Sequence, residues 1–242
     1  MSLDPDSLER LVPNAIDPED PAARETLSLH LARYEFAARV ARPGRVLDLA
    51  CGVGYGTRHL LANNPALGPA LGVDVATDAV AYATAHYGGP HVRFVASDAL
   101  RFEDAEGFDT IVSLETIEHV PDPAALFAKL ASLLRPGGRL VASVPTTPSI
   151  DLNPHHLHDF SEASFAAFGA HHGLREVDRL KQEQRLALGT AWRGRRFTRE
   201  KLRANLPGYY LSHPDALLRR VATTLRHGFA NHYLTIAWEK NL

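Results

Sequence analysis

One short segment combines residue types that could carry out acid–base or metal chemistry. Glu115, Glu118 and His119 occupy positions i, i+3 and i+4, so one helical turn would place their side chains on a single face. Two carboxylates and an imidazole on one face could chelate a divalent ion such as Mg²⁺. Alternatively, His119 by itself could take a proton from a reacting group. The segment therefore predicts a reaction centre, with a metal site as one form of it.

A second segment, NPHHLHDF at 153–160, adds three histidines. It follows a predicted strand, so it should reach the same edge of a sheet as His119. We expect His155 or His156 to act as a base or as a further ligand, because neutral imidazole serves both purposes. The remaining histidines, His158 among them, are expected to be solvated or structural.

A glycine-rich loop follows the first apolar run and suggests a site for a cofactor. Gly52, Gly54 and Gly56 permit a tight turn and close approach of a ligand to the backbone. An ordinary strand-to-helix turn would also use such glycines. A nicotinamide-dependent dehydrogenase would have its third glycine where this chain has Thr57. The carboxylate of Asp48 suits a ligand with an ammonium group better than one with a pyrophosphate.

Acidic residues also follow the next two predicted strands. Asp74 is placed to accept hydrogen bonds from a ribose diol, a feature that dehydrogenases share. Asp98 could accept from an adenine amino group, and its alternative role is a helix N-cap. Cys51, the single cysteine, is expected to be a small packing residue rather than a nucleophile. One cysteine excludes an internal disulfide and fits a reducing, cytoplasmic compartment.

Strand-like and helical patterns alternate along the chain, which predicts a parallel sheet covered on both faces. Strands are expected at 45–50, 91–97, 108–114, 139–145, 174–180 and 232–240, and one further strand, the second along the chain, is expected to end at Asp74. Helices are expected at 22–41, 55–62 and 122–134, and two more are expected to start near Thr77 and Ser161. The predicted fold class is α/β, with a doubly wound, mostly parallel seven-stranded sheet. A single domain would span 1–242, with an N-terminal helical cap at 1–44 and a helical insertion at 184–230.

The insertion has a charge opposite to that of the rest of the chain. Between Gln184 and Ala230 there are ten Lys and Arg residues but two acids, within a chain whose formal net charge is −2. One interpretation is a lid that recognises an anionic acceptor or RNA. The other is a solvated cover, or a subunit contact, that pairs with the acidic remainder, and a homodimer stays open.

Composition is that of an ordinary globular protein. The 242 residues are 45% hydrophobic and 22% charged, enough apolar surface for one folded core. The N-terminus has acids and prolines where a signal peptide needs basic and then apolar blocks, and no apolar run reaches membrane-spanning length. The sequence thus predicts no membrane partner.

The segment VLDLACGVGYG at 46–56 resembles the first motif of class I S-adenosylmethionine-dependent methyltransferases. ERLVP at 9–13 and RYEFA at 33–37 resemble a bacterial subgroup whose Arg-Tyr pair closes over the cofactor. Glu-x-x-Glu-His at 115–119 is similar to a segment of ubiquinone-type O-methyltransferases and of small-RNA 2′-O-methyltransferases, where it can bind a metal. The resemblance implies a cofactor site formed by Arg33, Asp48, Ala50, Gly52, Gly54, Tyr55, Asp74, Val75, Asp98, Ala99, Leu114 and Glu115.

The activity expected from these patterns is methyl transfer from S-adenosylmethionine to a small-molecule hydroxyl. His119, His155 and His156 are the catalytic candidates, and Glu115, Glu118 and His119 the metal candidates. The acceptor could be anionic or sugar-like. The alternatives are an RNA 2′-O-methyltransferase, a nucleotide-cofactor dehydrogenase and a non-catalytic cofactor-binding module.

Overall fold

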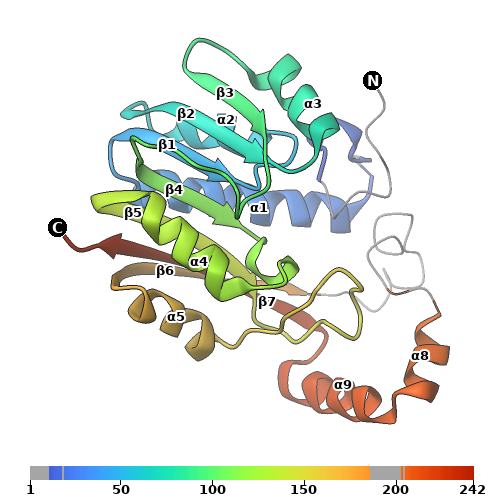
Figure 1. Cartoon of the computed structure of the whole chain (residues 1–242). Coiled ribbons are helices and arrows are strands. Elements are labelled where there is room, and N and C mark those ends of the chain that lie inside the picture. Colours follow the sequence, from blue (N-terminus) through green and yellow to red (C-terminus); the bar gives the residue numbers. More distant parts are fainter. Residues whose placement is uncertain (1–10, 18, 186–202, 204) are drawn as a thin grey trace.

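The computed structural model describes residues 11–17, 19–185, 203 and 205–242, and its core is one seven-stranded sheet (Figure 1). The strands are β1 (Gly44–Leu49), β2 (Leu67–Asp74), β3 (Val92–Ala96), β4 (Phe108–Leu114), β5 (Leu134–Pro145), β6 (Leu174–Arg185) and β7 (Ala230–Lys240). Their order is β3-β2-β1-β4-β5-β7-β6, and β7 pairs antiparallel with both of its neighbours. The predicted doubly wound, mostly parallel sheet is confirmed.

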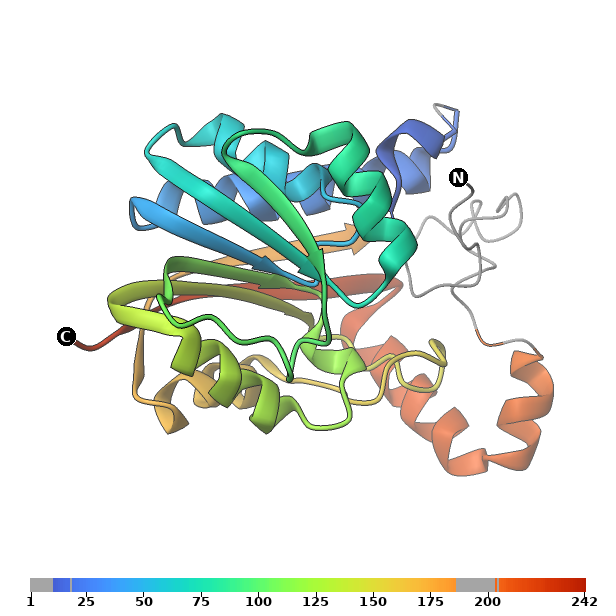
Figure 2. The same ribbon diagram turned by 45° about the horizontal axis from the view of Figure 1, so that its top comes forward.

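Helices cover both faces of the sheet, as Figure 2 shows. The helices are α1 (Pro21–Val40), α2 (Tyr55–Asn63), α3 (Thr77–Tyr87), α4 (Pro123–Leu133), α5 (Glu162–His171), α8 (Leu206–Ser212) and α9 (Pro214–His227), with short 3₁₀ turns η1 (Pro13–Ala15) and η2 (Ile117–His119). One layer holds α1, α2 and α3, and the other holds α4 and α5 (Figure 2). Strand order reverses between β1 and β4, and open sheets of this kind bind their ligands beyond the carboxyl ends of the strands at such a point.

Local sequence explains where the helices begin. Asp20 accepts hydrogen bonds from two backbone amides of the first turn of α1, and Pro21 supplies a preset φ at its first position. Asp122 caps α4 in the same way, and Ser161 forms a capping box with Ser164 at α5. These caps set helix starts within a residue of the sequence-based expectation.

The two sides of the sheet have separate cores. On the α4–α5 side, Trp238 of β7 packs edge-to-face against Phe127 and Phe165, with ring centroids 5.2 Å apart in both pairs. On the α1–α2 side, Tyr34, Phe36, Ala37 and Ala38 of α1 form one buried cluster with residues of the sheet such as Val46.

Strand β6 is longer than the sequence-based expectation of 174–180. It pairs with β7 as far as Arg185, so the first residues of the predicted insertion belong to the sheet. Its polar side chains bond to α1: Gln182 donates to the carbonyl of Leu29, and Gln184 donates to the hydroxyl of Thr26. Because this face of β6 meets a helix through glutamines, the strand lacks the apolar alternation that would have extended the prediction.

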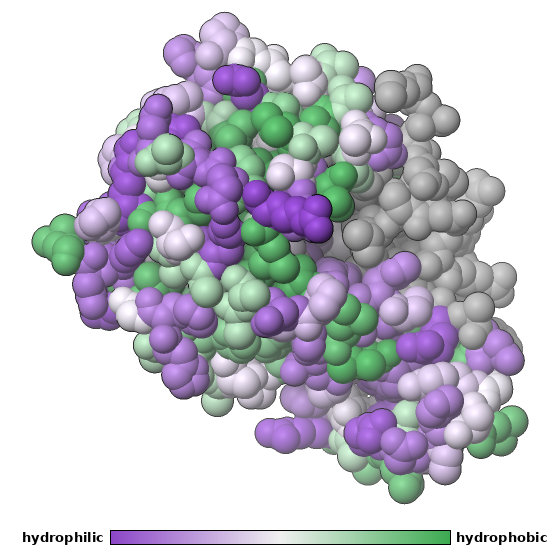
Figure 3. Space-filling view, viewed as in Figure 1, coloured by the Kyte–Doolittle hydropathy of each residue, from purple (hydrophilic) through white to green (hydrophobic). Residues whose placement is uncertain are grey.

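The described part of the insertion consists of Arg203, α8 and α9 at the carboxyl edge of the sheet (Figure 2). Residues 186–202 and 204 of the predicted insertion, like residues 1–10 of the predicted cap, lie outside the described residues. Hydrophobic patches interrupt the polar surface over α8 and α9 (Figure 3), where Leu211 and Leu225 are strongly exposed. Among the described helices, none combines the length and the apolar character needed to cross a bilayer.

Candidate active site

The glycine loop after β1 presents bare backbone toward open space. Gly52 has φ +56°, and a Cβ at this position would meet no atom within 4 Å. Gly54 has φ +83°, and a Cβ there would lie 2.7 Å from that of Ala83. Ala50 adopts φ 66°, a left-handed conformation that non-glycine residues rarely take. The loop is therefore held in a strained turn that leaves room for a ligand beside Gly52.

Asp48 lies beneath this loop and does not face the open space. Its side chain is 1% exposed, and it accepts hydrogen bonds from Thr57 Oγ1 at 2.6 Å and from Tyr34 Oη at 3.2 Å. The idea that Asp48 meets an ammonium group directly is thus wrong for this structure, because α1 and α2 cover the carboxylate. Thr57, which stands where a dehydrogenase would have glycine, is the residue that binds it.

Burial raises the pKa of Asp48 to about 7, although the hydroxyls of Thr57 and Tyr34 oppose the shift. Between pH 3.8 and about 7 the folded chain therefore holds a proton that the unfolded chain releases, so stability falls as pH rises. Asp48→Asn should lack this decline. We expect the difference in unfolding free energy, variant minus wild type, to increase with pH in urea titrations, and a pH-independent difference would contradict this origin.

Asp74 connects the end of β2 to the glycine loop. Its Oδ2 accepts from the amide of Gly52 at 2.8 Å, and its Oδ1 accepts from the amide of Ala76 at 3.0 Å. An ionised carboxylate has further acceptor positions for a ligand. The next residue, Val75, is 60% exposed and offers an apolar surface at the same edge.

Asp98 and Ala99 follow β3, the strand beside β2, at the same carboxyl edge of the sheet. Asp98 Oδ1 accepts from the amides of Leu100 and Arg101, at 2.9 and 3.1 Å. It therefore caps a turn, close to the alternative role considered from the sequence, although no helix follows. The Asp98 side chain is exposed, so the second carboxylate oxygen remains at the surface.

Arg33 places a cation inside the α1–α2 side of the molecule. The side chain is 1% exposed, its Nε donates to Gln182 Oε1 at 2.8 Å, and its guanidinium stacks 4.4 Å from the ring centroid of Tyr233. Nη1 is buried without a hydrogen-bond partner among the described residues, and it forms an ion pair with Glu115 Oε1 at 3.7 Å. A buried donor without a hydrogen bond is costly, so Nη1 keeps the capacity to donate to a further anionic group.

Glu115 does not share a helical turn with Glu118 and His119, contrary to the sequence-based expectation. Glu115 directly follows β4 with φ 48°, and helical geometry begins only at η2. Its Oε1 accepts from Ser143 Oγ of β5 at 2.6 Å, which fixes the carboxylate beside Arg33. Glu115 therefore lies beside Arg33 and Ser143, and the group of described residues that could hold a metal does not include it.

His156 takes the place that Glu115 was expected to fill. Ligand atoms of Glu118, His119 and His156 all lie within 4.8 Å of one another, and Glu118 is 1% exposed. The rings of His119 and His156 meet edge-to-face with centroids 4.8 Å apart. The structure thus brings together one predicted residue from the 153–160 segment with two from the segment after β4.

A backbone contact determines the tautomer of His119, the last residue of η2. His119 Nδ1 lies 3.0 Å from the carbonyl oxygen of His155, which can only accept a hydrogen bond. In the neutral ring the proton is therefore on Nδ1 and the lone pair on Nε2, the form needed for a base or a ligand. His158 donates from Nε2 to the carbonyl of Val120, which gives that ring a structural role.

Basic residues of the insertion bond to the loop between β5 and α5. Arg220 forms an ion pair with Asp151 and donates to the carbonyl of Pro148 at 2.7 Å. Arg203 donates to the carbonyls of Ile150 and Asp151, both at 3.2 Å. These described bases are engaged within the protein, which favours the cover interpretation for this part of the insertion.

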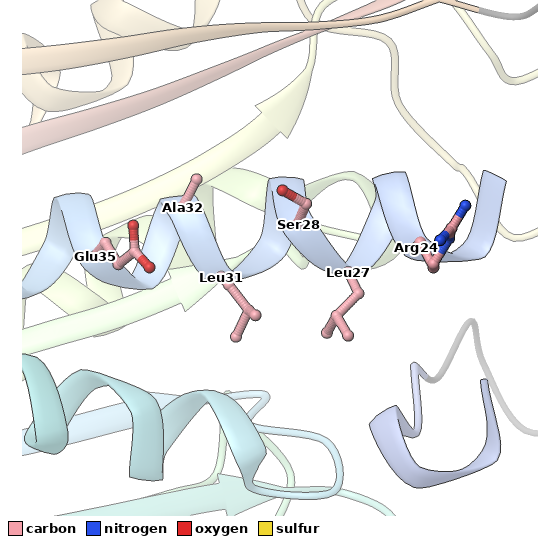
Figure 4. A pocket seen from close by; sticks show the side chains of 6 residues that line it. All are labelled: Arg24, Leu27, Ser28, Leu31, Ala32 and Glu35. Carbon is pink, nitrogen blue, oxygen red and sulfur yellow. The ribbon is translucent and has the colours of Figure 1, made fainter. Parts of the chain in front are cut away.

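A cavity of about 290 Å³ runs along one side of α1 and is separate from the residues above (Figure 4). Its described lining consists of Arg24, Leu27, Ser28, Leu31, Ala32 and Glu35. Figure 4 shows Leu27 and Leu31 pointing to the same side of the helix. None of the candidate cofactor or histidine residues lines it, so it carries none of the chemistry described here.

Comparison with known proteins decides the family. A family model described as a methyltransferase domain matches residues 23–202, most of the chain. The chain belongs to the methyltransferase domain family. A ubiquinone biosynthesis O-methyltransferase of Xanthomonas campestris pv. campestris is 37% identical over 123 residues, 48% of this chain and 50% of that relative. The chain therefore matches only about half the length of this curated relative.

Solved structures support the same fold for this methyltransferase domain. N-methyltransferase NodS of Bradyrhizobium japonicum, in complex with S-adenosyl-L-homocysteine, superimposes with a TM-score of 0.59 at 18% identity, covering 92% of this chain and 89% of that chain. The [4+2]-cyclase SpnF gives a TM-score of 0.60 at 17% identity, covering 94% and 86%. At these identities the likeness establishes the fold, and a cyclase among the neighbours shows that the fold does not fix the reaction.

Two residues of this methyltransferase domain were not singled out by sequence reasoning. Ser143 donates to Glu115, and Ser149 contacts His156. A polar residue inside the apolar run of β5 was the available signal for Ser143. Ser149 lies in an irregular loop, where no periodic pattern marks it.

Proposed function

We propose that this chain binds S-adenosylmethionine and transfers its methyl group to a small-molecule hydroxyl. The observation that carries the proposal is the buried Nη1 of Arg33, which has no hydrogen-bond partner among the described residues, together with the open glycine loop after β1, in a chain of the methyltransferase domain family. A carboxylate is the complement of a buried guanidinium donor. S-adenosylmethionine carries one at its methionyl end.

The other parts of this cofactor have matching groups at the same edge. Asp74 retains acceptor capacity for a ribose diol, and Gly52 allows close backbone approach. Val75, Ala99 and Leu114 offer apolar contact, and the exposed carboxylate of Asp98 could accept from an adenine amino group. When bound, the cofactor supplies an electrophilic methyl group on a sulfonium. The protein's part is to hold the two reactants in line and to exclude water.

The histidine cluster supports a hydroxyl acceptor. A hydroxyl must lose its proton as it is methylated, whereas a free amine needs no base. His119 Nε2 would take that proton, and Glu118, with an oxygen 3.8 Å from Nε2, would stabilise the resulting imidazolium. The name of the ubiquinone biosynthesis relative points to O-methylation, and that of NodS to the N-methylation alternative.

The same cluster of side chains could instead bind a metal ion. Glu118, His119 and His156 offer one carboxylate and two imidazoles. Imidazole suits Zn²⁺ or another first-row ion, whereas Mg²⁺ prefers oxygen ligands. This donor set therefore fits a transition-metal ion better than the Mg²⁺ expected from the sequence. Such an ion would lower the pKa of a coordinated hydroxyl.

An RNA acceptor is less well supported than a small molecule. Electrostatic RNA binding needs unengaged basic side chains, whereas Arg203 and Arg220 are bonded to the loop at 148–152. Arg219 pairs with Asp215 on its own helix. Among the described residues of the insertion, these contacts favour a small acceptor, anionic or sugar-like, over a nucleic acid.

Calorimetry with S-adenosylmethionine and with NAD tests the cofactor. We expect S-adenosylmethionine to bind and Arg33→Met to weaken binding about 10- to 100-fold, because a charge-assisted hydrogen bond is lost. Arg39→Met is the matched control, since Arg39 is on the same helix but 66% exposed and paired with Asp178. Tighter binding of NAD, or equal losses in both variants, would contradict the proposal. Mass spectrometry of products from paired hydroxyl and amine acceptors then separates O- from N-transfer.

A further inference from the structure

We propose that Ser149 is a positioning residue for His156 and that α9 fixes Ser149 through Arg220 and Asp151. The inference rests on the proposed function, because it assumes that the cluster of Glu118, His119 and His156 takes part in the reaction. It assigns a role to the insertion that requires no contact between its basic residues and the acceptor.

The contact between Ser149 and the histidine ring is short and directional. Ser149 Oγ lies 2.6 Å from His156 Nδ1. A hydroxyl at this nitrogen restricts the rotation of the ring, and it can pair with either tautomer because it both donates and accepts. Outer partners of this kind orient histidines at metal and catalytic sites. His119 has the equivalent partner in the carbonyl of His155, so both rings of the cluster are held through Nδ1.

Ser149 is itself fixed by the loop around it. Its amide donates to Asp159 Oδ1 at 2.7 Å, and its carbonyl accepts from the amides of Leu152 and Asn153 at 2.9 and 2.8 Å. Both backbone groups are therefore engaged within the loop, which fixes the backbone of Ser149 beside the imidazole.

The same turn is anchored to α8 and α9. Arg220 forms two charge-assisted bonds with Asp151, and its Nη2 also donates to the carbonyl of Pro148, which directly precedes Ser149. Tyr210 of α8 donates to Asp151 Oδ2 at 2.6 Å. The Arg220 and Asp151 side chains are only 17% and 14% exposed, so solvent screens this ion pair less than a surface pair. A displacement of α9 would therefore move the turn that carries Ser149.

Nitrogen-15 NMR of the histidine rings in the ligand-free protein gives a test that is independent of turnover. The signal that disappears in His156→Gln is assigned to His156. We expect the Nδ1 signal of His156 to show a hydrogen bond in the wild type, to lose it in Ser149→Ala and to regain it in Ser149→Thr, which keeps the hydroxyl. Arg220→Met should shift the spectrum toward that of Ser149→Ala. Arg219→Met is the matched control, since Arg219 is 71% exposed and pairs only with Asp215 in the described structure.

Turnover supplies the second measurement. Ser149→Ala and Arg220→Met should lower kcat about tenfold without changing KM for S-adenosylmethionine, while Arg219→Met keeps the wild-type value. An unchanged His156 spectrum in Ser149→Ala would overturn the inference, as would a changed spectrum with unchanged kcat. A wild-type chain that binds no S-adenosylmethionine would remove the proposed function, and the ring spectra would still decide whether Ser149 positions His156.

Discussion

His119→Gln is expected to lower kcat by about 10²- to 10⁴-fold and to leave the affinity for S-adenosylmethionine unchanged. Glutamine has nearly the length of histidine, but its amide cannot take a proton near neutral pH. The backbone carbonyl of His155 holds the wild-type ring in the tautomer with its lone pair on Nε2, so the proton acceptor is lost in the variant. Single-turnover methylation followed by mass spectrometry measures the chemical step directly.

His158→Gln is the control, because His158 is in the same region but its Nε2 donates to the carbonyl of Val120. This variant should retain wild-type kcat. Turnover in the presence of EDTA distinguishes a general base from a bound metal ion. If the site holds a metal ion, EDTA lowers wild-type turnover and added Zn²⁺ or Mn²⁺ restores it. Equal kcat for His119→Gln and the wild type would contradict the assignment in either form.

Gly56→Ala is expected to destabilise the fold by about 1–3 kcal/mol and to abolish measurable binding of S-adenosylmethionine. A Cβ on Gly56 would lie 2.0 Å from Cζ of Tyr34, a distance that forces the ring or the loop to move. Tyr34 donates to Asp48 beneath the loop, so the displacement would also disturb the turn that should receive the cofactor. Urea unfolding and calorimetry measure the two effects.

Gly89→Ala is a suitable comparison for this variant. Gly89 lies at the surface, and a Cβ there would meet nothing within 4 Å. This variant should match the wild type in both measurements. Wild-type affinity in Gly56→Ala would show that the Tyr34 ring can move aside without changing the loop.

Most of the fold could be predicted because its signals are local. Buried parallel strands such as β4, at Phe108–Leu114, appear as short apolar runs, and Asp122 and Ser161 mark helix starts. Two strands extend well beyond their expected bounds: β5 begins at Leu134 instead of residue 139, and β6 continues to Arg185. At the end of β6, Gln182 and Gln184 face α1 through hydrogen bonds instead of apolar packing. Such a strand is recognised only when its partner helix is known.

The candidate site was less predictable, because its side chains come together through backbone geometry. Spacing alone placed Glu115 with Glu118, but a left-handed φ at Glu115 directs it toward Ser143 and Arg33. His156 joined the cluster through a loop whose path the sequence did not indicate. Because these residues directly follow strands, the sequence predicted the edge of the sheet at which they lie. The direction in which each side chain points was visible only in the structure.

Strand β7 lies between β5 and β6 although it follows both in the chain. During translation, β1 to β5 can therefore pair in their final order, while β6 has no strand beside it until Ala230–Lys240 has left the ribosome. Until then the growing chain presents open strand edges, the feature that aggregation and chaperones exploit. Trp238 lies on this last strand against Phe127 and Phe165, so its indole is an intrinsic optical reporter of the moment when the sheet closes.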